Sequence, residues 1–113
     1  MNNQANSPCP PTGFPQSFWV RDIEVKPAVV LAPMEGVTNI VFRRLIRKIG
    51  GPGLTYTEFI ASNALQHRGK KVLELAEFDP EEQPIAIQIF GRQPEEMAEA
   101  AKVIQDLGAS IST

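Results

Sequence analysis

The strongest constraint on the fold is an alternation of continuous apolar runs with helical segments. The apolar runs cover residues 28–32, 54–57 and 85–90, and helical spacing follows the first and the third. Runs without polar alternation are typical of strands that are buried on both faces, as in a parallel sheet. The repeated β–α order therefore predicts an α/β fold with parallel strands inside and helices outside.

Such a sheet can be an open, doubly wound sheet or a closed barrel. The loop after the first apolar run lacks G-x-G-x-x-G, which weakens the doubly wound, dinucleotide-binding alternative. A (β/α)8 TIM barrel usually needs about 250 residues, and the chain has 113. We therefore expect residues 18–113 to hold only the first three to four βα units. An open strand edge would remain, so we do not expect a complete, stable domain.

The remaining elements follow from local signals. Residues 1–17 hold four of the ten prolines and are predicted to be a flexible lead-in. Residues 18–20 and 23–25 predict a short hairpin. Residues 60–68 suggest a short helix, residues 69–83 fit either helix or strand, and Asp79 to Glu82 suggest a turn. Ala109 to Ile111 suggest the start of a fourth strand.

Two longer helices carry clear caps. The first can start at Thr38 or Asn39 and ends at Gly50, and the last begins at Pro94 and ends at Gly108. The predicted buried stripe of the first is Val41, Phe42, Leu45, Ile46 and Ile49, with Arg43, Arg44, Arg47 and Lys48 mostly off it. The stripe of the last is Met97, Ala100, Ala101, Ile104 and Leu107.

Composition excludes several classes of protein. A net charge of −2 and a pI near 5.4 do not suggest a nucleic-acid binder that acts through bulk charge. A single cysteine cannot form an internal disulfide or a cysteine-based zinc site, and we expect no metal. No apolar run is long enough for a membrane span, and the N-terminus does not resemble a signal peptide. The default expectation is a soluble, cytoplasmic protein.

Candidate functional residues follow the predicted strands, because βα barrels place their active site at the C-terminal ends of the strands. Pro33, Met34 and Glu35 follow the first strand. Proline and methionine could simply fill the top of a barrel, or they could pack against a flat ring system while backbone groups bond its edge. Gln88 interrupts the third apolar run, and its amide could bond a neighbouring strand or the imide-like edge of a flavin or pyrimidine. For Glu58, after the second strand, a structural ion pair is the simplest interpretation.

Other reactive residues have simpler explanations. His67 lies in a polar stretch that predicts a solvent-exposed helix end. The basic residues of the first helix, such as Arg43 and Arg47, could meet phosphates but more often form a solvated face. Cys9 has no basic neighbour in sequence that would activate it.

Several segments together resemble the tRNA-dihydrouridine synthase family. APMEGVTN at residues 32–39 with Phe42 and Arg43 resembles the family's opening APMxGVTD…FR signature. Residues 53–54 with 57–58 resemble its GL…TE, PIAIQIFG at residues 84–91 resembles its P[IV]AVQIFG strand, and residues 94–101 and 107–109 resemble the following P..MA.AA…GA. The similarity covers residues 28–111.

The resemblance implies an FMN-binding (β/α)8 barrel followed by a small helical domain. NADPH would reduce the flavin, which would then reduce uridine to 5,6-dihydrouridine in tRNA while a cysteine protonates the adjacent carbon. By motif, Pro33, Met34 and Glu35 match the first flavin-binding loop, and Gln88 matches a flavin-contacting glutamine.

The sequence departs from the family pattern in two places. Asn39 stands where the family more often has aspartate, and the family's G-C-P cysteine follows strand 4, which places it beyond Thr113. We therefore expect no catalytic residue within this chain and no activity of the chain alone. Two alternatives stay open: another FMN-dependent barrel oxidoreductase with a small-molecule substrate, and a non-catalytic interaction module. The oligomeric state cannot be predicted.

Overall fold

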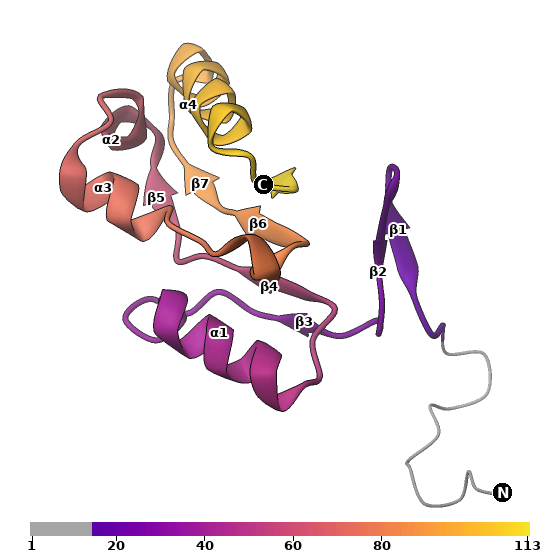
Figure 1. Ribbon diagram of the computed structural model, residues 1–113. Coiled ribbons are helices and arrows are strands. Elements are labelled where there is room, and N and C mark those ends of the chain that lie inside the picture. Colours follow the sequence, from indigo (N-terminus) through magenta and orange to yellow (C-terminus); the bar gives the residue numbers. More distant parts are fainter. Residues whose placement is uncertain (1–14) are drawn as a thin grey trace, which may run out of the picture.

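The computed structural model describes residues 15–113 and has an α/β fold built on a parallel sheet (Figure 1). The sheet consists of β3 (Val30–Leu31), β4 (Leu54–Tyr56), β6 (Ile85–Ile87) and β8 (Ile111–Ser112). Its spatial order, β3-β4-β6-β8, is the order of the strands in the chain, and all three pairings are parallel. The sheet therefore grows in one direction and has no point at which the strand order reverses.

A second parallel pair continues two of these strands. β5 (Ile60–Ala61) follows β4 and pairs with β7 (Ile89–Phe90), which follows β6. The third apolar run is thus two short strands interrupted at Gln88, not one strand. Residues 60–68 likewise begin with a strand before they turn into the expected helix.

Within residues 15–113, four α-helices connect the strands. They are α1 (Ile40–Ile49), α2 (Ser62–Gln66), α3 (Lys70–Leu75) and α4 (Pro94–Leu107), and a short 3-10 turn, η1 (Pro80–Glu82), precedes β6. The structure thus assigns residues 69–83, which fitted either helix or strand, to α3 and η1. Asn39 is the N-cap of α1, and its side chain accepts a hydrogen bond from the Phe42 N–H at 2.9 Å. Gly50 and Gly108 have positive φ angles and end α1 and α4, as predicted.

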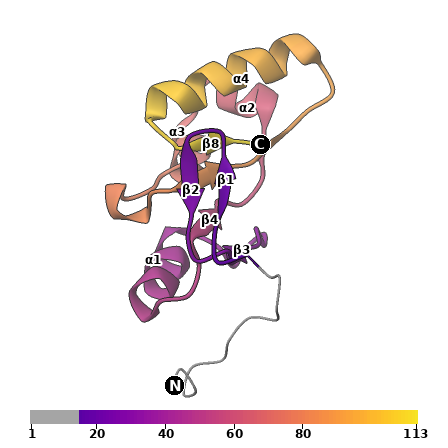
Figure 2. The same cartoon turned by 90° about the vertical axis from the view of Figure 1, so that its right-hand side faces the viewer.

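The hairpin predicted at residues 18–25 is present as β1 (Phe18–Val20) and β2 (Ile23–Val25). Figures 1 and 2 show it standing beside the N-terminal ends of the sheet strands, away from the helices. Its Val25 packs in one core cluster with Leu54 and Ala86. The predicted flexible lead-in, residues 1–17, lies outside the described residues except for 15–17.

The main core lies between the sheet and the helices that follow it. Side chains from β5, β6 and β7 pack there against α2 and α4, and the buried members include Ile60, Leu65, Ile87, Ala100 and Ile104. In α4 the predicted stripe is only partly correct. Val103 is buried although the prediction left it out, and Leu107 is 37% exposed.

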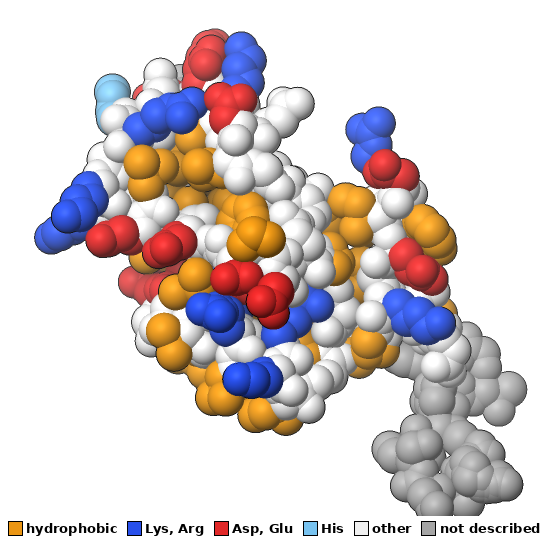
Figure 3. All heavy atoms as spheres, viewed as in Figure 1, with side chains coloured by type: hydrophobic (Ala, Val, Ile, Leu, Met, Phe, Trp, Pro, Cys, Tyr) orange, Lys and Arg blue, Asp and Glu red, His pale blue; other side chains and the backbone are white. Residues whose placement is uncertain are grey.

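Two burial predictions at the other end of the sheet are wrong. The first strand is not buried on both faces: Val29 and Val30 are exposed, because β3 is an edge strand within residues 15–113. The apolar stripe predicted for α1 also faces outward in part, because Val41 is 72% and Ile49 73% exposed. Phe42 and Ile46 of the same stripe are half-buried. Figure 3 shows the resulting apolar surface over α1. The helix instead turns Arg43 inward, where that side chain is only 1% exposed.

Candidate functional site

The loop after β3 is a compact turn that closes around Met34. The Met34 carbonyl accepts hydrogen bonds from the Val37 N–H at 3.0 Å, the Thr38 N–H at 3.0 Å and the Thr38 hydroxyl at 3.1 Å. The Thr38 hydroxyl oxygen in turn accepts from the Met34 N–H at 3.0 Å. Gly36 has a φ of +76°, a conformation that residues with side chains rarely adopt. The sequence thus specifies the loop through one buried threonine and one glycine.

Glu58 connects this loop to the end of the neighbouring strand. Its Oε1 accepts a hydrogen bond from the Gly36 N–H at 2.6 Å, across 22 residues of sequence. The ion pair expected for Glu58 is not present within residues 15–113. The carboxylate bonds a backbone amide instead, because the loop after β3 presents an N–H directly to it.

Gln88 lies where the third strand breaks. Its N–H donates to the Thr57 hydroxyl at 3.3 Å, and its carbonyl accepts from the Ile60 N–H at 2.9 Å. The Thr57 hydroxyl itself donates to the Glu58 carbonyl at 3.0 Å. The side-chain oxygen of Gln88 is buried and has no hydrogen-bond partner among the described residues. The expected bond to a neighbouring strand is therefore made by the backbone of Gln88 and not by its side-chain oxygen.

These residues form one edge of the molecule. Parallel strands end at the same edge of a sheet, so the loop after β3, Glu58 after β4 and Gln88 after β6 meet there. Met34, Glu35 and Gly36 are exposed, and Pro33 is half-buried. We call this edge the strand-end rim. It contains all four residues that the sequence singles out for cofactor binding, while their role in binding stays a prediction.

Two aromatic residues at the rim were not predicted. Phe59 and Phe90 form an edge-to-face pair, with ring centroids 5.4 Å apart and planes at 72°. Phe59 directly follows Glu58, Phe90 is the last residue of β7, and both side chains are substantially exposed. In a sequence, a hydrophobic residue at a strand end cannot be distinguished from an ordinary core residue. Only the rule that successive side chains of a strand point to opposite faces could have indicated that Phe90 points away from Ile89.

A buried ionic network holds α1 beneath the rim. The Arg43 Nε lies 2.8 Å from Glu82 Oε1, and the exposed fraction of each side chain is 1%. The other Arg43 nitrogens donate to the Thr38 carbonyl at 2.9 Å and the Glu77 carbonyl at 2.7 Å. Arg47 donates to the Glu82 carbonyl at 2.8 Å, and burial lowers the pKa of its guanidinium although Glu82 acts in the opposite direction. The predicted solvated basic face is therefore wrong for Arg43 and Arg47.

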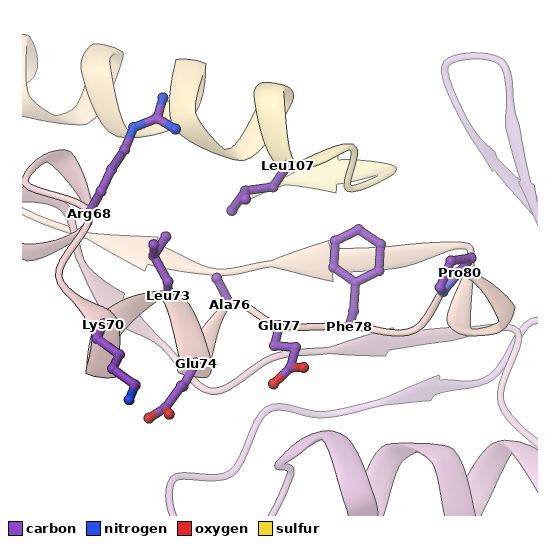
Figure 4. A pocket seen from close by; sticks show the side chains of 9 residues that line it. All are labelled: Arg68, Lys70, Leu73, Glu74, Ala76, Glu77, Phe78, Pro80 and Leu107. Carbon is purple, nitrogen blue, oxygen red and sulfur yellow. The ribbon is translucent and has the colours of Figure 1, made fainter.

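The groove in Figure 4 lies elsewhere, between α3 and the C-terminal end of α4. It has a volume of about 780 Å³ and an apolar floor with charged side chains around it. Its lining comprises Arg68, Lys70, Leu73, Glu74, Ala76, Glu77, Phe78, Pro80 and Leu107. None of the residues of the strand-end rim lines it, so the chemistry predicted from the sequence is not located there.

Comparison with known proteins assigns the chain to a family. Residues 30–111 match the family described as dihydrouridine synthase (Dus). The chain belongs to the dihydrouridine synthase family. The matched segment contains the strand-end rim and the sheet strands β3, β4 and β6, and it ends within β8. The family resemblance inferred from the sequence is thereby confirmed.

Curated relatives of this family carry consistent names. A probable tRNA-dihydrouridine synthase of Aquifex aeolicus is 47% identical over 79 residues, 70% of this chain and 24% of the relative. Probable tRNA-dihydrouridine synthase 1 of Synechocystis is 34% identical over 88% of this chain and 28% of the relative. Probable tRNA-dihydrouridine synthase 2 of Bacillus subtilis is 37% identical over 82% of this chain and 29% of the relative. The chain thus spans 24–29% of the length of these relatives.

Two further observations concern residues 15–113. None of the helices in this part of the chain combines the length and the apolar character that a membrane crossing requires. Within the same residues, no three side chains of the metal-binding types gather closely enough to hold an ion.

Proposed function

We propose that this chain forms the first βα units of an FMN-binding (β/α)8 barrel that reduces uridine to 5,6-dihydrouridine in tRNA, with NADPH as reductant. The strand order supports the barrel, because β3, β4, β6 and β8 are neighbours in chain order, as the successive strands of a barrel must be. The names of the relatives support tRNA as the substrate. A tRNA substrate fits a cytoplasmic enzyme.

The observation that carries the flavin assignment is the buried side-chain oxygen of Gln88. It has no hydrogen-bond partner within residues 15–113, and a buried polar atom without a partner costs about 1–3 kcal/mol. A ligand that donates a hydrogen bond at the strand-end rim would remove this cost. The imide edge of an isoalloxazine offers both a donor and acceptors, which suits a carboxamide.

The other rim residues suit the same ligand. Pro33 and Met34 offer apolar surface to a ring system, and Glu35, an exposed residue, offers its backbone polar groups to the edge of the ring. FMN, when bound, would supply hydride transfer. We propose that Gln88 orients the ring and that Met34 excludes water from one side of it.

Proton donation is not assigned to these residues. The one cysteine of the sequence is Cys9; it lies outside the described residues and precedes β1. We therefore propose that residues 1–113 bind and orient the flavin but do not by themselves complete the reaction.

The proposed reaction is tested in cells of the organism that encodes the chain. Deleting the gene should lower the dihydrouridine content of tRNA, measured by mass spectrometry of tRNA digests, and a plasmid copy of the gene should restore it. A copy that carries Gln88→Leu should restore little, whereas Gln105→Leu, at an exposed site on α4, should restore it fully. Dihydrouridine content that does not change on deletion would refute the proposed substrate and reaction.

The flavin site is tested on the purified chain by NMR. Adding FMN to the ¹⁵N-labelled chain should shift the side-chain amide of Gln88 with weak affinity, a Kd on the order of 1 mM or about −4 kcal/mol. Weak binding is expected because these residues form only the first three to four of the eight βα units that would surround the flavin in a complete barrel. Sub-micromolar binding, or shifts confined to residues outside the strand-end rim, would contradict the assignment.

A further inference from the structure

We propose that Glu58 is a positioning residue: its carboxylate holds the loop after β3 in the shape that receives the flavin. The inference rests on the proposed function, because it assumes that the strand-end rim binds FMN. It adds a residue to that site which contacts the loop and not the ligand.

The loop has few other restraints. Its own hydrogen bonds all converge on Met34, and residues 34–37 are exposed. Segments with little packing open locally at small free-energy cost. The bond from the Gly36 N–H to Glu58 Oε1, at 2.6 Å, ties this loop to the next strand. Bonds to a charged acceptor are shorter and roughly twice as strong as neutral ones.

The segment that carries Glu58 also holds Gln88. Thr57, the preceding residue, accepts the Gln88 N–H at 3.3 Å and donates to the Glu58 carbonyl at 3.0 Å. The Thr57 N–H further donates to the Ala86 carbonyl at 2.9 Å. Thr57 and Glu58 therefore link the two halves of the proposed flavin site at the rim, beyond the pairings of β3 with β4 and of β4 with β6.

The carboxylate has no competing ionic partner. Within residues 15–113 no cationic group lies within 4.0 Å of it, and its one hydrogen bond goes to Gly36. Aspartate would keep the charge, but it is shorter by one methylene group and could not reach a donor that now lies at 2.6 Å. Glutamine would lose the charge but keep the reach and an acceptor oxygen. The two variants separate the effect of position from the effect of charge.

The experiment compares the wild-type chain with Glu58→Asp, Glu58→Gln and a control, Glu74→Gln, at an exposed site on α3. Two quantities are measured by NMR: hydrogen exchange of the Gly36 amide, and the FMN-dependent shift of the Gln88 side-chain amide. In Glu58→Asp we expect Gly36 exchange to accelerate, and FMN affinity to fall, on the order of tenfold each, the factor for losing one hydrogen bond to a charged group. Glu58→Gln should stay within about threefold of wild type, and the control should change neither quantity.

The outcomes distinguish the two proposals. In one outcome, Glu58→Asp has the wild-type exchange rate at the Gly36 amide and the wild-type affinity for FMN. In another, exchange at Gly36 is faster but the affinity for FMN is unchanged. Either outcome would show that Glu58 is not a positioning residue and would leave the flavin site standing. If Glu58→Gln loses as much as Glu58→Asp, an acceptor oxygen at this reach is not sufficient to hold the loop, and the inference is overturned. If wild type shows no FMN-dependent shift at Gln88, the flavin site itself is wrong and the inference falls with it.

Discussion

The buried pair of Arg43 and Glu82 gives the sharpest test of the packing described above. Each side chain is only 1% exposed, and the closest nitrogen and oxygen are 2.8 Å apart. At an effective dielectric constant of 20, two unit charges at this distance attract by about 6 kcal/mol. Desolvation offsets much of that attraction at several kcal/mol per ion. The net contribution of the pair is therefore small, but removing one partner leaves the other charge buried and unpaired.

Glu82→Ala should accordingly destabilise the fold by about 3–5 kcal/mol. The Glu82 carboxylate also accepts the Asp79 N–H at 2.7 Å, so the variant loses part of the η1 cap as well. The measurement is urea unfolding followed by circular dichroism, in which the midpoint moves and the slope is unchanged. The loss is a large part of the 5–15 kcal/mol typical of a native domain. The variant could therefore populate the unfolded state even without urea.

Two controls decide whether burial is the cause. Glu99→Ala breaks the exposed pair of Lys102 and Glu99, which lie 3.4 Å apart, and should cost less than about 1 kcal/mol. The double variant Arg43→Met with Glu82→Leu removes both charges and should recover most of the stability lost in Glu82→Ala. A loss of under 1 kcal/mol in Glu82→Ala, similar to that of Glu99→Ala, would refute the reasoning.

Two further predictions concern single positions. Gly91→Ala should destabilise the fold by about 1–3 kcal/mol, because a Cβ there would collide with the Ser62 hydroxyl and lie 3.0 Å from the Met97 sulfur. The free energy of unfolding is measured with urea. A loss smaller than roughly 0.5 kcal/mol, the limit for an ordinary surface change, would count against the close packing at Gly91. Asn39→Ala should lower stability by about 1 kcal/mol by removing the cap on the Phe42 N–H. Asn39→Asp should keep the cap and stay close to wild type, and equal losses in both variants would show that the cap bond is not the cause.

Local signals in the sequence predicted most of the elements. The hairpin, the Asn39 cap and the glycine ends of α1 and α4 each depend on residues within one or two turns of each other. The order of strands followed because consecutive βα units place their strands side by side in the same direction. These features were predictable because their causes are local or generic.

The orientation of α1 could not be predicted in this way. Its apolar spacing indicated that Val41 and Ile49 face the core, yet both are exposed. Arg43 is buried instead, because Glu82 and the carbonyls of Thr38 and Glu77 satisfy its charge and its donors. Two of these partners lie more than 30 residues away in sequence, so no pattern within the helix could reveal that an arginine would be the buried residue.

The same distinction applies to the strand-end rim. Met34 and Gln88 each follow a strand of the parallel sheet, and parallel strands end at the same edge. For this reason the sequence was enough to place the two residues together. The connection between them, from Gly36 through Glu58 and Thr57 to Gln88, depends on hydrogen bonds of 2.6 to 3.3 Å across 22 and 31 residues. A strand register shifted by one residue would keep every motif letter and turn Glu58 away from the loop. The motif therefore identifies the family, whereas the exchange rate of the Gly36 amide reports whether this register is the one that the protein adopts.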